Sequence, residues 1–425
     1  MATLYWHNLN TGNNANDRTN YSTDQAGTIA AGGGAMAADD IRTDGSGGTK
    51  DDNMTASAAL AYGSFDLDAG YGGVFDDNGQ VITIGLAGVA HLLIANTVSL
   101  LTSTGVWKQT ETGNISNPAV TNRFYQLEMG FSGKTNTLTG DVRIKEKLTV
   151  GSGIVTNTIH NVDFLILTQN DFLVIDSGAT ITMDIRIYAA NDVTQSAFEC
   201  AGFTGSLKWL QTPATSKLSL TGTWNIPNSG GIEFIRGEID FNDQNVTIGG
   251  TVQLGDADAV VGTLRCGDGI VNLVNIKKHT GSSGVLNLYF EGSTFNLSED
   301  MNFTDIIVTP GTATIDLINT ATKTITGDGQ TVYNLVKSGV GITEIADNFN
   351  VNSLAPTAGT IRSDVADTLR VITCAVNALG SNTTFKDISV GSIGKVDAKI
   401  GGVNQGNNPG IIFEDLLMPS LLGFV

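Results

Sequence analysis

The stretch that decides the fold runs from residue 231 to residue 336 and contains three phrases (sequence segments) of similar composition and pattern. They read GIEFIRGEIDFNDQNVTIGGTVQLG (residues 231–255), GIVNLVNIKKHTGSSGVLNLYFEGSTFNLS (residues 269–298) and DIIVTPGTATIDLINTATKTITGDGQTVYNLV (residues 305–336). Each phrase contains short runs rich in Val, Ile, Thr and Phe that end at Gly, Asn or Asp, which is typical of strands and turns. Each is also about as long as one coil of a β-helix. The phrases therefore predict stacked coils.

Similar apolar runs recur outward from these phrases, beginning at about residue 81. Their starts are roughly 7 to 12 residues apart, which leaves no room for intervening helices. An antiparallel sandwich or barrel would favour Asn-Gly and Asp-Gly hairpins. Asn-Gly occurs once, at Asn78, and Asp-Gly occurs only at Asp44, Asp268 and Asp328. We therefore expect an all-β chain that forms a right-handed parallel β-helix.

Three parts are expected along the chain. Residues 1–75 are rich in small and polar side chains and would form an N-terminal cap or attachment region, residues 76–400 the β-helix body, and residues 401–425 a closing segment with an apolar tail. At about 25 residues per coil the body would contain roughly a dozen coils. Since strands stack about 4.8 Å apart, the body would be on the order of 60 Å long. Both ends need a cover, because an open strand edge invites aggregation.

The charge excludes several classes of partner. The net charge is −19 and only 15% of the residues are charged. Binding to nucleic-acid phosphates or to an anionic membrane surface requires basic patches, so neither is expected. The apolar stretch from residue 84 to residue 101 is interrupted by Gly85, Gly88, His91 and Asn96, which favours two buried strands over a membrane span. No secretory signal is visible, so we expect synthesis in a cytoplasm.

Residues that could hold a metal are scattered. The three cysteines are far apart and odd in number, which argues against a disulfide framework or a zinc site. The Asp-rich turns at residues 39–52, 76–78 and 256–258 could supply oxygen ligands to Ca²⁺, but none has the spacing of an EF-hand loop. Solvated turns are the expected interpretation, with no metal and no cofactor.

Polysaccharide cleavage is the main chemical alternative, because it requires only two carboxyl groups held several ångströms apart. Sequence cannot tell which acids meet across coils, so all of them are also ordinary turn residues. The candidate acids are Asp176, Asp184, Glu233, Glu238, Asp240, Glu291 and Asp316, and the aromatic residues that could stack on sugars are Trp107, Trp209, Trp224, Tyr188 and Tyr289. At 7% aromatic content, we expect these rings to lie in the core or at its rim and the chain not to be an enzyme.

Both ends of the chain carry a resemblance. LYW at residues 4–6, NYS at residues 20–22 and ADDI at residues 38–41 are similar to the start of bacteriophage right-handed parallel β-helix virion proteins. FKDIS at residues 385–389 and GVNQGNNPGIIF at residues 402–413 resemble their last strand and closing phrase. The internal TITGDGQTVYNLV at residues 324–336 resembles one of their recurring coils.

The resemblance implies a tail fibre, a spike or a capsid-decoration protein located in the virion, and it supplies no catalytic residue. It also implies assembly with other virion proteins, self-association as a homotrimer and contact with a host-surface glycan. The alternatives are a receptor-binding tailspike with polysaccharide hydrolase or lyase activity, and a bacterial surface adhesin, which the missing export signal disfavours.

The tail IIFEDLLMPSLLGFV (residues 411–425) is the most apolar end of the chain. It is interpreted either as a cap on the last coil or as an anchor inserted into another subunit or virion protein. The candidate assembly residues are Ile411, Ile412, Phe413, Leu416, Leu417, Met418, Leu421, Leu422 and Phe424.

Overall fold

The computed structural model is all-β, and its stacked parallel strands form a β-solenoid of about 14 turns. This confirms the parallel β-helix expected from the sequence. The only helix among the described residues is one 3-10 turn, η1 (Arg18–Asn20). The structure describes residues 2–7, 9, 13–25, 31, 39–43, 53–68, 71–85, 89–95, 100–119, 121–157, 159–167, 169–189, 191–209, 216–234, 236–255, 261–280, 284–376, 378–391 and 396–413.

The chain divides into two compact units, unit 1 (Met1–Ile232) and unit 2 (Glu233–Val425). The strands before residue 231 are β1 (Thr3–Trp6), β2 (Tyr21–Ser22), β3 (Asp40–Arg42), β4 (Met54–Thr55), β5 (Leu60–Tyr62), β6 (Phe65–Leu67), β7 (Phe75–Asp76), β8 (Val81–Ile84), β9 (Leu92–Ile94), β10 (Leu101–Thr102), β11 (Val106–Gln109), β12 (Gly113–Asn117), β13 (Phe124–Met129), β14 (Thr135–Val150), β15 (Ile154–Thr156), β16 (Asn161–Leu167), β17 (Leu173–Ile175), β18 (Thr180–Ile181), β19 (Asp184–Ala189), β20 (Val193–Gln195), β21 (Phe198–Glu199), β22 (Gly202–Phe203), β23 (Ser206–Trp209), β24 (Lys217–Leu220) and β25 (Trp224–Ile226).

The strands from residue 231 onward are β26 (Gly231–Phe234), β27 (Gly237–Asp240), β28 (Val246–Leu254), β29 (Gly262–Arg265), β30 (Ile270–Lys278), β31 (Leu286–Tyr289), β32 (Thr294–Leu297), β33 (Met301–Asn302), β34 (Ile306–Thr309), β35 (Thr314–Leu317), β36 (Lys323–Thr326), β37 (Thr331–Lys337), β38 (Ile342–Ile345), β39 (Phe349–Pro356), β40 (Thr360–Ser363), β41 (Arg370–Cys374), β42 (Ala378–Ser381), β43 (Thr384–Lys386), β44 (Ile388–Gly391), β45 (Val396–Ile400), β46 (Val403–Asn404) and β47 (Ile411–Ile412).

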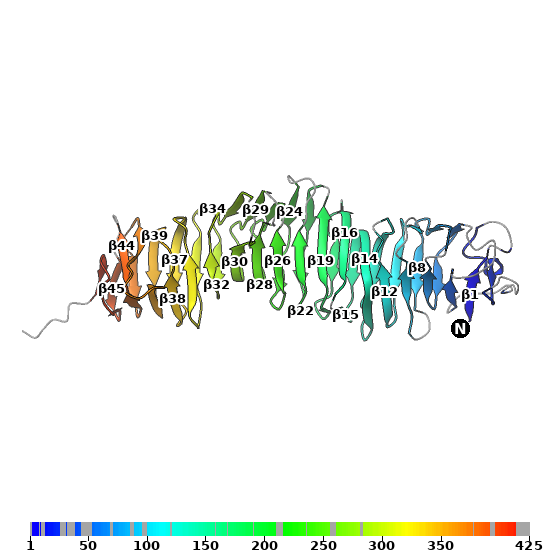
Figure 1. Ribbon diagram of the computed structural model, residues 1–425, viewed down its shortest axis with the longest axis horizontal. Helices are drawn as coiled ribbons and strands as arrows, with labels where there is room; N and C mark the ends of the chain where they lie inside the picture. The colour runs from blue at the N-terminus through cyan, green and yellow to red at the C-terminus, as the bar shows by residue number, and fades with distance from the viewer. Residues whose placement is uncertain are drawn as a thin grey trace, which may run out of the picture. The chain divides into compact units, whose positions relative to one another are not determined.

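Strands of unit 1 pair in parallel with the equivalent strand one turn later. In the series β8, β11, β13, Val106 lies opposite Val81 of the preceding turn on one side and opposite Gln126 of the following turn on the other. Figure 1 shows the same side-by-side order for β12, β14, β16 and β19. The chain therefore adds one layer to the sheet with each turn.

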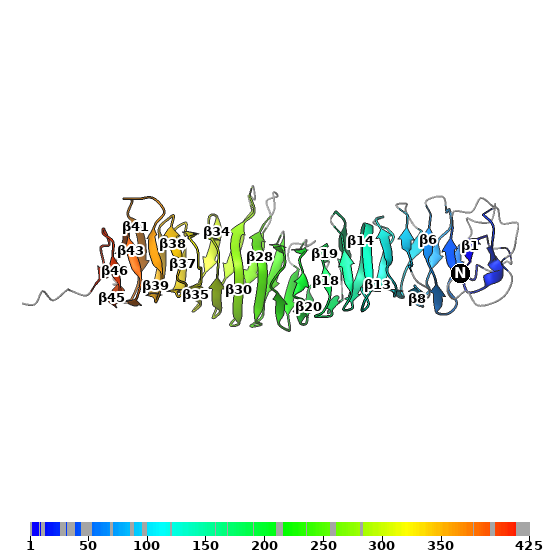
Figure 2. The ribbon, with the colours of Figure 1, turned by 90° about the horizontal axis from the view of Figure 1, so that it is seen from below.

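Unit 2 repeats this arrangement with turns of unequal length. Val271 lies opposite Val246 of the preceding turn and opposite Phe295 of the following turn. Further along, Ile342 lies opposite Thr360, so these register partners are closer in sequence than Val246 and Val271 are. Figure 2 shows β28 and β30, and then β37, β38 and β39, following one another along the unit. The expected length of about 25 residues per coil thus holds for the first of these turns, whereas the longer sequence phrases contain more than one turn.

The core of unit 2 is a column of apolar side chains, because parallel in-register pairing places equivalent side chains over one another. Val246, Val271, Phe295, Ile315 and Leu335 succeed one another in this way, and none is more than 1% exposed. Each burial contributes about 1.5–3 kcal/mol relative to exposure. Alternation of buried and outward residues along each strand supplies this inner face.

One corner of unit 2 is fixed by residues in the left-handed backbone conformation. Asp243, Gly267, Glu291 and Gly311 have φ between 55° and 66°. A Cβ at Gly267 would lie 2.3 Å from the backbone nitrogen of Asp243, and one at Gly311 would lie 2.2 Å from the carbonyl oxygen of Glu291. Glycine is therefore required at every second level of this corner.

Residues 1–75, expected to form a cap, already contain solenoid-type pairing. β1 is antiparallel to β2, and the rings of Trp6 and Tyr21 meet edge to face with centroids 5.2 Å apart. β1 also pairs in parallel with β3, and β3 with β6. Parallel pairing therefore starts before residue 76.

Close stacking makes the following prediction. A Cβ at Gly113 in β12 would lie 1.4 Å from the carbonyl oxygen of Ala90 on the neighbouring turn. Gly113→Ala should therefore destabilise the protein by about 1–3 kcal/mol, measured as a lower midpoint of denaturant unfolding. Gly178→Ala is the matched control, since its Cβ would meet no atom closer than 3.3 Å. Equal midpoints for the two variants would contradict the stacking.

Candidate functional site

Two of the candidate acids meet at one cation. Arg265 at the end of β29 lies 3.2 Å from Glu238 through Nε and 3.2 Å from Glu291 through Nη1. Its guanidinium carbon lies 4.0 Å from the ring centre of Tyr289, another candidate residue. Burial lowers the pKa of Arg265, but the two carboxylates outweigh this effect and leave that pKa raised. These four residues, named here the Arg265 clamp, join three successive turns.

The other candidate acids are held by separate contacts. Glu233 lies half-buried in β26. Four acids each accept a backbone N–H at 2.8 to 3.1 Å: Asp176 from Gly178, Asp184 from Ser206, Asp240 from Asn242 and Asp316 from Ser338. Each of these side chains stabilises its own turn or the next turn. The four acids therefore have the structural role that is expected of turn residues.

The candidate tryptophans lie in the core. Trp107, Trp209 and Trp224 are at most 2% exposed. Trp107 packs against Phe65, with ring centroids 5.4 Å apart. The expectation that these rings lie in the core or at its rim is therefore confirmed for the tryptophans, which lie in the core. Tyr188 and Tyr289 are half-buried on the outer side of their strands.

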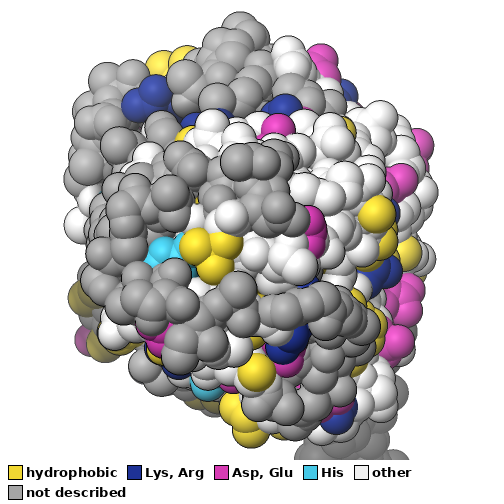
Figure 3. All heavy atoms as spheres, turned by 90° about the vertical axis from the view of Figure 1, so that its right-hand side faces the viewer, with side chains coloured by type: hydrophobic (Ala, Val, Ile, Leu, Met, Phe, Trp, Pro, Cys, Tyr) yellow, Lys and Arg dark blue, Asp and Glu magenta, His cyan; other side chains and the backbone are white. Residues whose placement is uncertain are grey.

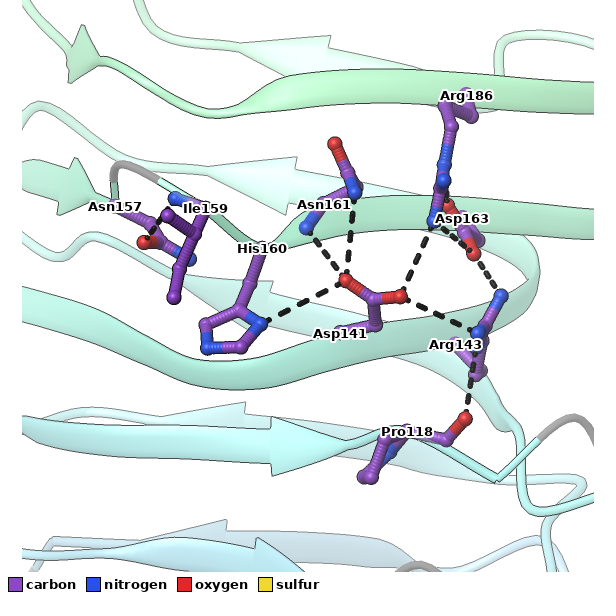
Figure 4. A network of polar contacts seen from close by, with 9 residues as sticks. All are labelled: Pro118, Asp141, Arg143, Asn157, Ile159, His160, Asn161, Asp163 and Arg186. Atoms are coloured by element: carbon purple, nitrogen blue, oxygen red, sulfur yellow. Dashed lines mark hydrogen bonds and ion pairs between the residues drawn. The ribbon is translucent and has the colours of Figure 1, made fainter.

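A second group of charges, which the sequence analysis did not single out, spans three turns of unit 1. We call Asp141, Arg143, Asp163 and Arg186 the charge network (Figure 4). Pairing places Asp163 opposite Arg143 on one side and Arg186 on the other. Asp163 accepts from Arg186 Nε at 2.6 Å and also pairs with Arg143. Asp141 lies 3.3 Å from Arg143 and 3.2 Å from Arg186.

Burial makes the ion pairs of the charge network costly to break. The Asp163 side chain is fully buried, and burial is the largest cause of the lowered pKa of Arg143. A buried carboxylate that lost its partners would remain as an uncompensated charge, which costs about 3–5 kcal/mol. The charge network therefore stabilises the observed pairing register of β14, β16 and β19.

A hollow of about 160 Å³ adjoins the charge network. His160 Nδ1 lies 3.9 Å from Asp141 Oδ1, and the backbone N–H of Asn161 donates to the same oxygen at 2.9 Å (Figure 4). Ile159 at the rim is 78% exposed. The walls thus combine hydrogen-bonding residues with two apolar ones, and they consist of Asn157, Ile159, His160, Asn161, Thr182, Met183 and Asp184.

A third cluster in unit 2 was also missed by the sequence analysis. A hollow of about 190 Å³ is lined by Glu344, Asp364 and Asp387 together with Arg362, Lys386, Ser363 and Ala366. Glu344 pairs with Arg362 at 2.6 Å, and Asp364 pairs with Arg370 at 2.8 Å. Carboxylates from successive turns therefore share this hollow.

The turn at residues 76–78 was considered as a Ca²⁺ site. Its central carboxylate, that of Asp77, accepts hydrogen bonds from groups of the protein itself. Asp77 is fully buried and accepts from Gly79 N, Ser103 Oγ, Thr104 N, Gly105 N and Trp107 Nε1 at 2.5 to 3.1 Å. Residues 44–52 and 256–258 lie outside the described residues. Within the described ranges, no three His, Cys, Asp or Glu side chains form a set of metal ligands. The three cysteines are free and buried.

The predicted assembly residues divide into two sets. Ile411 and Ile412 form β47, which pairs in parallel with β45. Ile411 is 9% exposed and Ile412 is 37% exposed, while the ring of Phe413 lies 6.1 Å from that of Phe385. The other predicted residues, Leu416, Leu417, Met418, Leu421, Leu422 and Phe424, lie outside the described residues.

The comparisons with known proteins give no family. No family model matches the chain, and neither the curated proteins nor the solved structures contain a match. Among the described residues, no helix is long and apolar enough to cross a bilayer. Function must therefore be argued from the geometry of the chain itself.

The Asp77 contacts predict a stability defect. Asp77→Asn turns an acceptor-only carboxylate into an amide whose NH₂ faces bound N–H groups, so the free energy of unfolding should fall by about 1–3 kcal/mol. Asp76→Asn is the control, since Asp76 accepts from Asn78 N in an exposed contact. Unfolding midpoints should not respond to added Ca²⁺; a Ca²⁺-dependent rise in the wild type that Asp77→Asn abolishes would restore the calcium hypothesis.

Proposed function

We propose that the chain is a structural virion component of a bacteriophage, a stiff β-helical fibre, spike or capsid-decoration protein that mediates assembly or host attachment. The observation that carries this proposal is the Arg265 clamp. Two candidate catalytic carboxylates, Glu238 and Glu291, share one guanidinium and join neighbouring turns. Ion pairs between neighbouring turns stiffen the solenoid. A stiff solenoid can act as a spacer without any catalytic site.

The resemblance of the chain ends to virion β-helix proteins supplies the setting of this proposal. On this resemblance we propose a location in the virion, with other capsid or tail proteins and further copies of the chain, as a homotrimer, for partners. A host-surface glycan is the further partner when the protein stands at the tail. The proposal includes no cofactor and no catalytic step.

The closing segment is the proposed attachment end. Among the described strands, β46 and β47 are the last in their sheets, and Val403 and Ile412 on them are 49% and 37% exposed. Apolar side chains at the last turn, continued by the apolar sequence of residues 416–424, fit an anchor in another virion protein.

Removing the anchor tests the proposal. A chain ending at Phe413 keeps every described strand, so it should retain its β-rich circular dichroism and unfolding midpoint. It should lose incorporation into particles, measured by mass spectrometry of purified virions after complementation. A variant with Leu421→Ser and Leu422→Ser should show an intermediate loss. Normal incorporation of the shortened chain would refute the anchor, and absence of the full chain from particles would refute the virion role.

One observation favours a second function, cleavage of a polysaccharide. Glu344, Asp364 and Asp387 line one hollow, and cleavage of a glycosidic bond requires two such acids close together. Asp387 is only 5% exposed. Such a site would make the protein a receptor-binding tailspike with hydrolase or lyase activity.

Cleavage is tested with host-surface polysaccharide and a reducing-end assay. Under the structural proposal the full chain releases no more reducing ends than buffer. Release that falls by about 10²-fold or more in Glu344→Gln or Asp387→Asn, and persists in the control Glu238→Gln, would establish the second function instead.

A further inference from the structure

The turn between β7 and β8 contains the one Asn-Gly step of the chain, Asn78-Gly79. Both residues are exposed, and both have positive φ, 47° for Asn78 and 74° for Gly79. The backbone N–H of Gln80 donates to the carbonyl oxygen of Asp77 at 2.8 Å, so Asn78 and Gly79 form the centre of a type I′ turn. Water therefore reaches the Asn-Gly step while the turn is closed.

An Asn-Gly step is chemically labile, because its two residues can react with each other. The backbone nitrogen of Gly79 loses its proton and attacks Cγ of Asn78. The new C–N bond closes a succinimide ring, and the side-chain amide nitrogen takes up a proton and leaves as ammonia. Water then opens the ring at either carbonyl carbon, which leaves aspartate or isoaspartate at position 78. Glycine favours the attack, since no Cβ shields its nitrogen.

Both reacting groups are held by hydrogen bonds in the closed turn. The backbone N–H of Gly79 donates to Asp77 Oδ1 at 3.1 Å. The side-chain NH₂ of Asn78 donates to the carbonyl oxygen of Ala56, on the preceding turn of the solenoid, at 3.3 Å. The Gly79 nitrogen must give up its proton and the Asn78 side chain must turn toward it, so both bonds have to break before the ring can close.

The Asp77 carboxylate opposes the loss of that proton. It is fully buried, and its Oδ1 also accepts from the backbone N–H groups of Thr104 and Gly105 on the following turn, at 2.9 and 3.0 Å. These contacts fix the oxygen beside the Gly79 nitrogen. A nitrogen anion formed there would face a carboxylate at hydrogen-bond distance, and like charges disfavour ionisation most strongly where water is excluded.

The product differs from the amide in its hydrogen bonding and its charge. A carboxylate at position 78 has no N–H for the carbonyl oxygen of Ala56, and it adds a negative charge beside Asp76 and Asp77. The chain already has a net charge of −19. Figure 3 shows the molecule from the side on which β1 lies, where Asp and Glu side chains already reach the surface among the described residues.

We propose that Asn78 is a site of deamidation and that the buried carboxylate of Asp77 sets its rate, so that the modification follows opening of the turn at residues 77–80. The closed turn protects Asn78, and a copy of the chain whose turn has opened gains a negative charge there. This inference is independent of the virion role proposed above.

The experiment incubates the full chain at mildly alkaline pH and follows conversion of the amide to a carboxyl group by peptide mass spectrometry, with fragmentation that assigns the change to position 78. The folded wild type should react more slowly than the same chain in denaturant by on the order of ten-fold or more, since one pKa unit changes the population of the nitrogen anion ten-fold. Asp77→Asn should react faster than the folded wild type by a similar factor.

Gly113→Ala is the matched control, because it disturbs the stacking of turns away from Asp77. It should keep the slow rate under conditions in which circular dichroism shows both variants to be folded. If Asp77→Asn fails to fold, the comparison of the folded and the denatured wild type still tests the proposal.

Faster deamidation in Asp77→Asn together with a slow rate in Gly113→Ala supports the proposal. A slower reaction in Asp77→Asn overturns it and makes the carboxylate a general base for the reaction. Equal rates in wild type and Asp77→Asn, or in the folded and the denatured wild type, also overturn it. The same holds for equal acceleration in Gly113→Ala, which would make general loosening of the solenoid the cause, and for an unchanged position 78 in denaturant.

Discussion

Parallel pairing of each strand with its equivalent one turn later is the constraint on which every other feature depends. It satisfies the backbone N–H and C=O groups of a strand with those of its two neighbours, which a single turn cannot do. It also places equivalent side chains over one another, so that inward apolar residues such as Val271 and Phe295 form a continuous core. A turn is therefore stable only within a stack.

The same constraint governs the outward charges. Like charges directly opposite each other on paired strands are destabilising, and opposite charges stabilise. The described charge clusters alternate in sign along the stacking direction, with Arg143, Asp163 and Arg186 in unit 1 and Glu238, Arg265 and Glu291 in unit 2. This alternation explains why Glu238 and Glu291, which are candidate catalytic acids in the sequence, form ion pairs between turns in the fold.

Much of the fold was predictable because it depends on local signals. Short β-branched runs ended by Gly or Asp, without hairpin dipeptides, were enough to indicate stacked coils. The acids that meet across turns were not predictable, since the sequence offset between register partners is not constant: it is larger from Val246 to Val271 than from Ile342 to Thr360. The hollow around Glu344 escaped the sequence analysis for that reason. Opposite charges that recur at the spacing of one coil were the only available signal for the charge network.

In-register stacking is tested most directly by cross-linking across one turn. Asn287 in β31 and Ile307 in β34 are register partners with partly or fully exposed side chains. Replacing both with cysteine should give a disulfide under mild oxidation, since paired strands lie about 4.8 Å apart and a disulfide requires Cα atoms within about 7 Å. The native cysteines are buried and leave the engineered pair as the accessible thiols. The control pair Thr263→Cys and Ile307→Cys spans two turns, about 10 Å, and should stay reduced. A disulfide in the control pair with none in the first pair would contradict the stacking on which the account depends.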